Sequence, residues 1–169
     1  TGFIGSHFGR MALAQGHDVV GFARHSDTRN IQRIEDYQAS SRFRLVYGDL
    51  TGDISGLLEG ADAVVHFAAR TFVDHSILDP EPFIQSNIVG TYKLLEQARK
   101  YKPKRYVQVS TDEVYGAILE GAYKEDARLN PTNPYSSTKA AADMLCLSYW
   151  NTYKVPIIIT RTENNYGPW

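Results

Sequence analysis

The stretch Thr1-Gly2-Phe3-Ile4-Gly5-Ser6-His7 decides the fold, because it has the form of the last part of a Gly-x-x-Gly-x-x-Gly turn that opens a helix. The first glycine of that pattern would lie two residues before Thr1. Such a turn lets the backbone approach the pyrophosphate of a dinucleotide, which the free N–H groups and the dipole of the helix attract. Two glycines alone favour an ordinary tight turn, so the rest of the chain must supply the context.

Strand and helix patterns alternate along the rest of the chain. Apolar runs predict strands at about 17–23, 43–49, 63–69, 105–110 and 155–160, and helical spacing predicts helices at about 54–58, 82–101 and 135–153. Near-continuous apolar runs, such as Ile157-Ile158-Ile159, indicate strands that are covered on both faces. We therefore expect an α/β fold with a doubly wound parallel sheet of Rossmann type.

The expected sheet has the strand order 3-2-1-4-5-6, of which residues 1–169 would lack the first strand and the C-terminal substrate domain. Residues 1–169 are thus predicted to be an NAD(P)-binding Rossmann domain, as a fragment of a longer protein. Without the central strand, backbone groups of its neighbours would have no partners. We expect this segment to be unstable and inactive by itself.

Composition narrows the range of partners. The 169 residues carry a net charge of −1 without a basic stripe or charge run, so neither nucleic acid nor a membrane surface is expected as a partner. No stretch approaches the roughly 20 apolar residues of a membrane span, and no metal site is expected. The single cysteine, Cys146, cannot form an internal disulfide and is expected to be buried, which favours a reducing, cytoplasmic location.

Two further stretches supply groups for acid–base chemistry, namely Ser110-Thr111-Asp112-Glu113-Val114-Tyr115-Gly116 and Tyr135-Ser136-Ser137-Thr138-Lys139. Asn133-Pro134 is a helix-start signal, so Tyr135 and Lys139 should share one helix face. An ammonium one turn away should lower the pKa of the phenol from its usual value of about 10. Each motif also has an interpretation without function. The first could be a solvated pair of carboxylates, and the second a surface tyrosine beside a solvated lysine.

The predicted fold brings these motifs to one edge. In a doubly wound sheet, ligands bind beyond the carboxyl ends of the strands. Five segments follow predicted strands or open the first helix at that edge: residues 2–5, 49–50, 68–71, 111–113 and 164–168. This convergence favours a functional site over five unrelated turns.

On these motifs the chain resembles the extended short-chain dehydrogenase/reductase family, and within it the dTDP-glucose 4,6-dehydratases. Its most specific parts are Ser-Thr-Asp-Glu-Val-Tyr-Gly at 110–116 and Asn-Asn-Tyr-Gly-Pro at 164–168. The resemblance implies a nicotinamide cofactor that is reduced and reoxidised in each turnover, a nucleotide-diphosphate sugar as substrate, and a homodimeric full-length protein. The implied reaction is oxidation at C4, elimination of water across C5–C6 and return of the hydride to C6.

The resemblance also implies roles for individual residues. Tyr135 would deprotonate the sugar 4-hydroxyl with the support of Lys139, Glu113 would be the base at C5, and Asp112 would protonate the departing C6 hydroxyl. With Thr111, these form the expected catalytic set, and the expected substrate-binding residues are Thr71, Thr111 and Asn164. The expected cofactor-binding residues are Gly2, Phe3, Ile4, Gly5, Arg24, Asp49, Leu50, Ala68, Ala69, Ser86, Tyr135, Lys139 and Asn165.

Two departures from the dehydratase pattern leave the cofactor and the substrate open. The second strand ends in Phe22-Ala23-Arg24-His25-Ser26, without the usual acidic residue for the adenosine ribose. Ala23 would not repel a 2′-phosphate and Arg24 could pair with one, so NAD and NADP are both candidates. The stretch 68–77 also differs from that of the dTDP-glucose enzymes, which leaves the sugar and its nucleotide undetermined.

Three other functions are compatible with the fold. A nucleotide-sugar 4-epimerase needs Tyr135 and Lys139 but no base at C5 or acid at C6, and nucleotide-sugar decarboxylases share the fold. A non-catalytic dinucleotide-binding protein would normally lack some of the four groups on Tyr135, Lys139, Asp112 and Glu113. The presence of Asp112 and Glu113 beside the Tyr-Lys pair favours a dehydratase.

Overall fold

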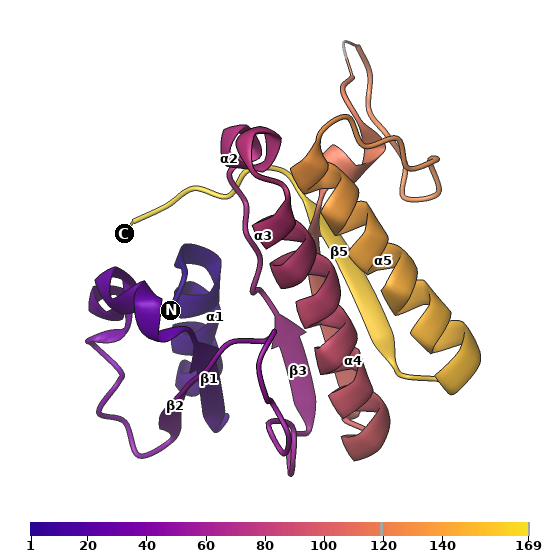
Figure 1. Ribbon diagram of the computed structural model, residues 1–169. Helices are drawn as coiled ribbons and strands as arrows, with labels where there is room; N and C mark the ends of the chain where they lie inside the picture. Colours follow the sequence, from indigo (N-terminus) through magenta and orange to yellow (C-terminus); the bar gives the residue numbers. More distant parts are fainter. Residues whose placement is uncertain (119, 169) are drawn as a thin grey trace. The chain divides into compact units, whose positions relative to one another are not determined.

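The computed structural model describes residues 1–118 and 120–168. The chain divides into two compact units, Thr1–Asp53 with Asn165–Trp169, and Ile54–Asn164. Each unit contains its own parallel sheet (Figure 1). We refer to them as the first unit and the second unit and describe each by itself.

The first unit contains one helix, a 3-10 helix and two strands. Helix α1 (Phe3–Ala14) precedes strand β1 (Val19–Ala23), the 3-10 helix η1 (His25–Ile34) and strand β2 (Phe43–Tyr47). The strands are parallel, and Val19 is opposite Phe43. Gly16, with a φ of 87°, follows the C-terminal end of α1, a conformation that is common just after a helix.

The second unit contains a three-stranded parallel sheet in the order β3-β4-β5, formed by Ala63–His66, Arg105–Thr111 and Ile157–Thr162. Figure 1 shows α4 (Gly90–Tyr101) and α5 (Pro134–Tyr153) side by side along this sheet. The shorter elements are α2 (Val73–Leu78), α3 (Glu81–Phe83), the π-helical turn η2 (Ile84–Val89) and the 3-10 turn η3 (Asp112–Tyr115). Buried residues that pack these layers include Leu95, Tyr106, Ala142 and Cys146.

The parallel strands and their alternation with helices confirm the predicted α/β class. The pairs β1-β2 and β3-β4-β5 match the predicted neighbours 2-3 and 4-5-6, and among the described residues no strand pairs with both β1 and β3. The predicted helix near 54–58 is wrong. Residues 55–60 form turns, in which Gly56 and Gly60 have φ values of 78° and 76° that a helix does not accommodate.

The start of α5 is fixed by a capping box. The Asn133 carboxamide accepts a hydrogen bond from the Ser136 N–H at 2.8 Å, and Ser136 Oγ accepts one from the Asn133 N–H at 3.2 Å. Pro134 occupies the first turn, where no backbone donor is needed. The cap therefore sets the position of Tyr135 at the beginning of the helix, as the sequence predicts. No helix in the described part of the chain is long and apolar enough to cross a membrane.

Candidate active site

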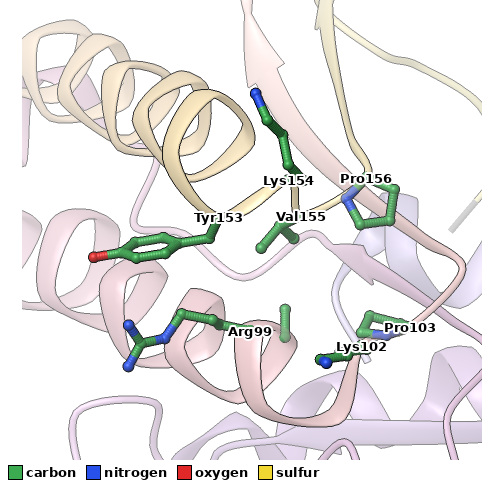
Figure 2. A pocket seen from close by; sticks show the side chains of 8 residues that line it. Arg99, Lys102, Pro103, Tyr153, Lys154, Val155 and Pro156 are labelled. Carbon is green, nitrogen blue, oxygen red and sulfur yellow. The ribbon is translucent and has the colours of Figure 1, made fainter.

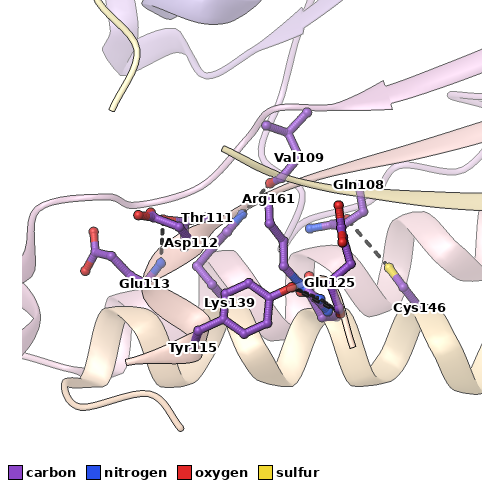
Figure 3. Close-up of polar contacts among 11 residues, drawn as sticks. Gln108, Val109, Thr111, Asp112, Glu113, Tyr115, Glu125, Lys139, Cys146 and Arg161 are labelled. Carbon is purple, nitrogen blue, oxygen red and sulfur yellow. Dashed lines mark hydrogen bonds and ion pairs between the residues drawn. The ribbon is translucent and has the colours of Figure 1, made fainter. Parts of the chain in front are cut away.

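Thr111, Asp112 and Glu113 form a turn at the carboxyl end of β4, which we call the acidic turn (Figure 3). Thr111 Oγ1 accepts a hydrogen bond from the Glu113 N–H at 3.3 Å and donates one to Asp112 Oδ1 at 3.1 Å. Val114 and Tyr115 follow and are buried, which anchors the turn in the core. Both carboxylates are thus held at the edge of the sheet and remain half-buried.

Tyr135 lies beside the acidic turn. Its side chain is 7% exposed, and its N–H donates to Ser76 Oγ at 3.0 Å. Burial raises the pKa of the phenol, Glu113 and Asp112 raise it further, and a hydrogen bond with Thr111 opposes them. The predicted lowering of this pKa by Lys139 is therefore wrong in direction, because burial and the two carboxylates outweigh any opposing charge. Because Thr111, Asp112 and Glu113 all affect this pKa, their side chains lie close to the Tyr135 phenol.

Lys139 lies one turn further along α5 and is 5% exposed. Its ammonium donates a hydrogen bond to the Val109 carbonyl of β4 at 2.6 Å (Figure 3). Burial lowers the pKa of Lys139, and the negative charge of Asp143 opposes this effect. The lysine is thus a buried cation between α5 and β4.

Asn87 is a site residue that the sequence analysis missed. Its buried side chain accepts a hydrogen bond from the Arg70 N–H at 2.8 Å and donates to the Arg70 carbonyl at 3.0 Å and to Thr138 Oγ1 at 2.9 Å. The available signal was its spacing in the predicted helix 82–101, where Asn87 lies three residues after Ile84 and four before Thr91. Asn87 fixes the loop after β3 and ties it to α5 next to Lys139.

The other predicted residues of the second unit surround these elements. Ala68 and Ala69 lie in the loop that Asn87 fixes, and Ser86 is half-buried in η2. Thr71 and Asn164 are exposed, after β3 and β5 respectively.

The first unit contains the predicted glycine turn. Gly2 is the N-cap of α1 without a side-chain cap, and a Cβ placed on it would meet nothing within 4 Å. The N–H groups at the start of the helix, those of Phe3, Ile4 and Gly5, have no acceptor within the helix itself. An open, glycine-capped helix end with these donors fits the pyrophosphate of a dinucleotide.

The remaining predicted residues of the first unit lie at strand ends. Arg24 follows β1 and is the N-cap of η1. Asp49 follows β2, where its carboxylate accepts hydrogen bonds from the N–H and the hydroxyl of Thr51 at 2.8 and 2.7 Å. Leu50 is buried, whereas Asn165 is exposed.

A cavity of about 380 Å³ lies elsewhere in the second unit, where α4 and α5 lead into β4 and β5 (Figure 2). It is at the opposite end of β4 from the acidic turn, and none of the predicted site residues lines it. Arg99 pairs with Glu96 at 3.0 Å, and Lys154 donates to the Asn151 carbonyl at 2.8 Å. The described residues contain no group of three or more side chains suited to a metal ion.

Comparisons with known proteins agree with this geometry. The family model described as GDP-mannose 4,6 dehydratase matches residues 1–169. A dTDP-glucose 4,6-dehydratase of Actinoplanes sp. is 40% identical over 182 residues, which cover 99% of this chain and 55% of that protein. The chain spans about half the length of the curated relatives it matches.

Solved structures give the same result. DesIV, a dTDP-glucose 4,6-dehydratase from Streptomyces venezuelae solved with NAD bound, has a TM-score of 0.92 and 40% identity, covering 99% of this chain and 54% of that one. A UDP-glucuronic acid 4-epimerase from Bacillus cereus in complex with NAD has a TM-score of 0.88 and 34% identity, covering 99% and 55%. The chain therefore belongs to the GDP-mannose 4,6-dehydratase family, within the extended short-chain dehydrogenases/reductases.

Proposed function

We propose that the full-length protein is an NAD(P)-dependent nucleotide-sugar 4,6-dehydratase. The observation that supports this most is the gathering of the Tyr135 phenol with the acidic turn. Oxidation followed by elimination needs a group that deprotonates an alcohol, a base for a carbon acid and an acid for the leaving hydroxyl. These side chains supply all three, and membership of the family favours the same reaction.

The proposed reaction oxidises C4 of the sugar, removes water across C5–C6 and reduces C6, so its products are a 4-keto-6-deoxy sugar nucleotide and water. The nicotinamide, when bound, supplies the acceptor for the C4 hydride and the donor for C6, so no external oxidant is consumed. Tyr135 takes the proton of the 4-hydroxyl, and Thr111 hydrogen-bonds the same oxygen. The 4-keto group acidifies the C5 proton, which Glu113 removes, and Asp112 protonates the C6 hydroxyl that leaves as water. Glu113 returns a proton, exchangeable with solvent, to C5 when C6 is reduced.

We propose that the two units are parts of one NAD(P)-binding Rossmann domain and that each contributes residues to dinucleotide binding. In the first unit they are the N-terminal turn of α1 and the residues after β1 and β2, namely Gly2, Phe3, Ile4, Gly5, Arg24, Asp49, Leu50 and Asn165. In the second unit they are Ala68, Ala69, Ser86, Tyr135 and Lys139. The NAD-bound relatives favour NAD, whereas Ala23 and Arg24 favour NADP, and the two remain alternatives in this proposal.

The proposed substrate is a nucleotide-diphosphate sugar, with Thr71, Thr111 and Asn164 as its contacts. A second copy of the protein is the proposed partner, because Met144, Leu147 and Trp150 form an exposed apolar row along α5. A cytoplasmic location is part of the proposal and rests on the single, buried thiol of Cys146. Light scattering of the full-length protein tests the dimer, which a monomeric mass would contradict.

The activity is tested by incubating the full-length protein with a panel of nucleotide sugars, with NAD and with NADP. We expect a product that has lost one water and carries a 4-keto group, detected by mass spectrometry and carbonyl trapping. A product of unchanged mass with inverted C4 would instead identify an epimerase, the alternative that the NAD-bound Bacillus cereus relative supports. Absence of any reaction across the panel would contradict both.

A further inference from the structure

Asp143 is a fully buried carboxylate that joins α5 to the end of β5. Its Oδ2 pairs with Nε of Arg161 at 2.9 Å. The same guanidinium donates to the Tyr115 hydroxyl at 2.7 Å and to the Glu125 carbonyl at 3.3 Å (Figure 3). Arg161 thus connects the carboxylate to the segment that follows the acidic turn.

The second oxygen of Asp143 is not used by Arg161. Both Asp143 Oδ1 and the buried Ser110 Oγ lack a hydrogen-bond partner of ordinary geometry, although Ser110 is close enough to lower the pKa of the carboxyl. Asp143 follows Lys139 by four residues, so the two side chains share one face of α5. Burial raises the pKa of Asp143, whereas Arg161 and Lys139 both oppose this rise.

The other titratable groups that act on Lys139 are neutral at pH 7. Burial raises the pKa of the Cys146 thiol to about 12. Burial and the charge of Lys139 lower the pKa of His66, on β3, to about 3. Thr91 Oγ1 donates to the Asn87 carbonyl at 2.7 Å and therefore accepts from His66 Nε2 at 3.1 Å, which fixes the neutral Nε2–H tautomer. Among these groups, the negative charge next to Lys139 comes from Asp143.

We propose that Asp143 is a positioning residue that keeps the buried Lys139 ammonium charged, and that Arg161 keeps Asp143 ionised in turn. The inference rests on the proposed function insofar as Lys139 supports the Tyr135 phenolate. A buried ammonium tends to lose its proton, and the carboxylates of the acidic turn act against ionisation of Tyr135. Neutralising Lys139 would therefore remove the positive charge that the phenolate needs.

The direct test is the titration of Lys139 in the full-length protein, followed by NMR of ¹³C-labelled lysine and assigned with Lys139→Arg. Asp143→Asn should lower the midpoint of Lys139 by about one pH unit or more, since a neighbouring charge of opposite sign is lost. Asp143→Glu should restore most of the shift. Asp62→Asn, which removes the carboxylate of an exposed ion pair with Lys104, should leave the midpoint unchanged.

The double variant Asp143→Asn/Arg161→Gln separates electrostatics from structure, and it supplies the measurement if Asp143→Asn alone does not fold. It leaves no buried, unpaired guanidinium, yet Lys139 should still titrate at lower pH because its carboxylate is gone. An unchanged midpoint in Asp143→Asn, or a return to the wild-type midpoint in the double variant, would overturn the proposal.

A second readout is the pH dependence of first-turnover cofactor reduction with the nucleotide sugar found in the panel. Its alkaline limit should shift to lower pH in parallel with the NMR midpoint, and a limit that does not move would overturn the proposal. If the wild-type protein reduces no cofactor with any sugar, the proposed function fails, whereas the NMR titration still decides the role of Asp143.

Discussion

The two units present polar groups in opposite ways. In the first unit, the proposed contacts at the glycine turn are backbone N–H groups at the open end of α1, and an ion pair such as Arg10–Asp36 is partly exposed to solvent. In the second unit, Lys139 and Asp143 are buried and each depends on partners from other elements. The proposed dinucleotide binding through the backbone depends on chain geometry. The proposed chemistry of the second unit depends instead on buried charges, which are sensitive to changes of single side chains.

The largest effects are expected in the acidic turn and at Tyr135, and they should separate the two halves of the reaction. Glu113→Gln removes a base, a role that contributes a factor of about 10²–10⁴, so elimination should stall after hydride transfer. Reduced nicotinamide should then accumulate on mixing with the sugar nucleotide. Tyr135→Phe should block hydride transfer and leave the cofactor oxidised, as followed by absorbance in the full-length protein.

Solvent deuterium at C5 of the sugar is the second measurement for these variants. Incorporation should be lost in Glu113→Gln, because no base reaches the C5 proton. Normal turnover by Glu113→Gln without reduced cofactor would show that Glu113 is not the base, and would favour an epimerase.

The next effect is on stability and concerns Asn87, which holds the loop after β3. Asn87→Ala removes three hydrogen bonds and leaves buried partners unsatisfied, so the free energy of unfolding should fall by about 2–4 kcal/mol. Denaturant unfolding of the full-length protein measures this. Gln85→Ala, at an exposed position of the same π turn, is the control and should change stability little. Equal effects of the two changes would mean that the loop does not depend on Asn87.

The cofactor preference tests a side chain of the first unit. If Arg24 contacts a 2′-phosphate, Arg24→Ala should weaken NADP binding by roughly 1.5–3 kcal/mol, the scale of a hydrogen bond to a charged group, and barely affect NAD. Calorimetric titration of both dinucleotides measures the difference. Arg44→Ala, an exposed arginine of β2, is the matched control. Equal weakening of NAD and NADP, or of neither, would assign Arg24 no part in the choice.

The smallest effect, measured over a single pH unit, is a pH dependence of stability from His66. Its pKa is lowered from 6.5 to about 3, so between these values the unfolded chain binds a proton that the folded protein does not. Stability should therefore fall as the pH drops from 6.5 toward 3, by at most about 1.4 kcal/mol per pH unit. His66→Gln should flatten this dependence in thermal unfolding, whereas the exposed His17→Gln should not. An equally steep dependence in His66→Gln would assign the acid sensitivity to other groups.

Much of the fold follows from local patterns, because alternating apolar runs and capping signals act over a few residues. The start of α5 at Asn133-Pro134 was predicted from such a signal and is confirmed by its capping box. The helix predicted near residues 54–58 failed because Gly56 and Gly60 adopt positive φ values that a helix does not accommodate. The prediction also missed η1, α2 and η3, which lack a long periodic pattern.

The candidate site was less predictable where it depends on burial. Gathering of Tyr135 with the acidic turn followed from strand order, since both lie at the carboxyl edge of the sheet. The pKa direction of Tyr135 did not follow, because helical spacing shows the neighbouring ammonium but neither the burial nor the facing carboxylates. Asn87 and Asp143 were overlooked for the same reason, as their partners are distant in sequence.

Because of the π turn at Ile84–Val89, the contacts of this helix depend on the number of its residues as well as on their identity. A π turn holds one residue more than an α-helical turn, and so rotates everything before it by about 100° relative to everything after it. Asn87 can thereby reach the loop after β3 while Leu94, Leu95 and Ala98 stay in the core. Deleting one residue here would give a more regular helix whose two halves could not both be in register with their neighbours.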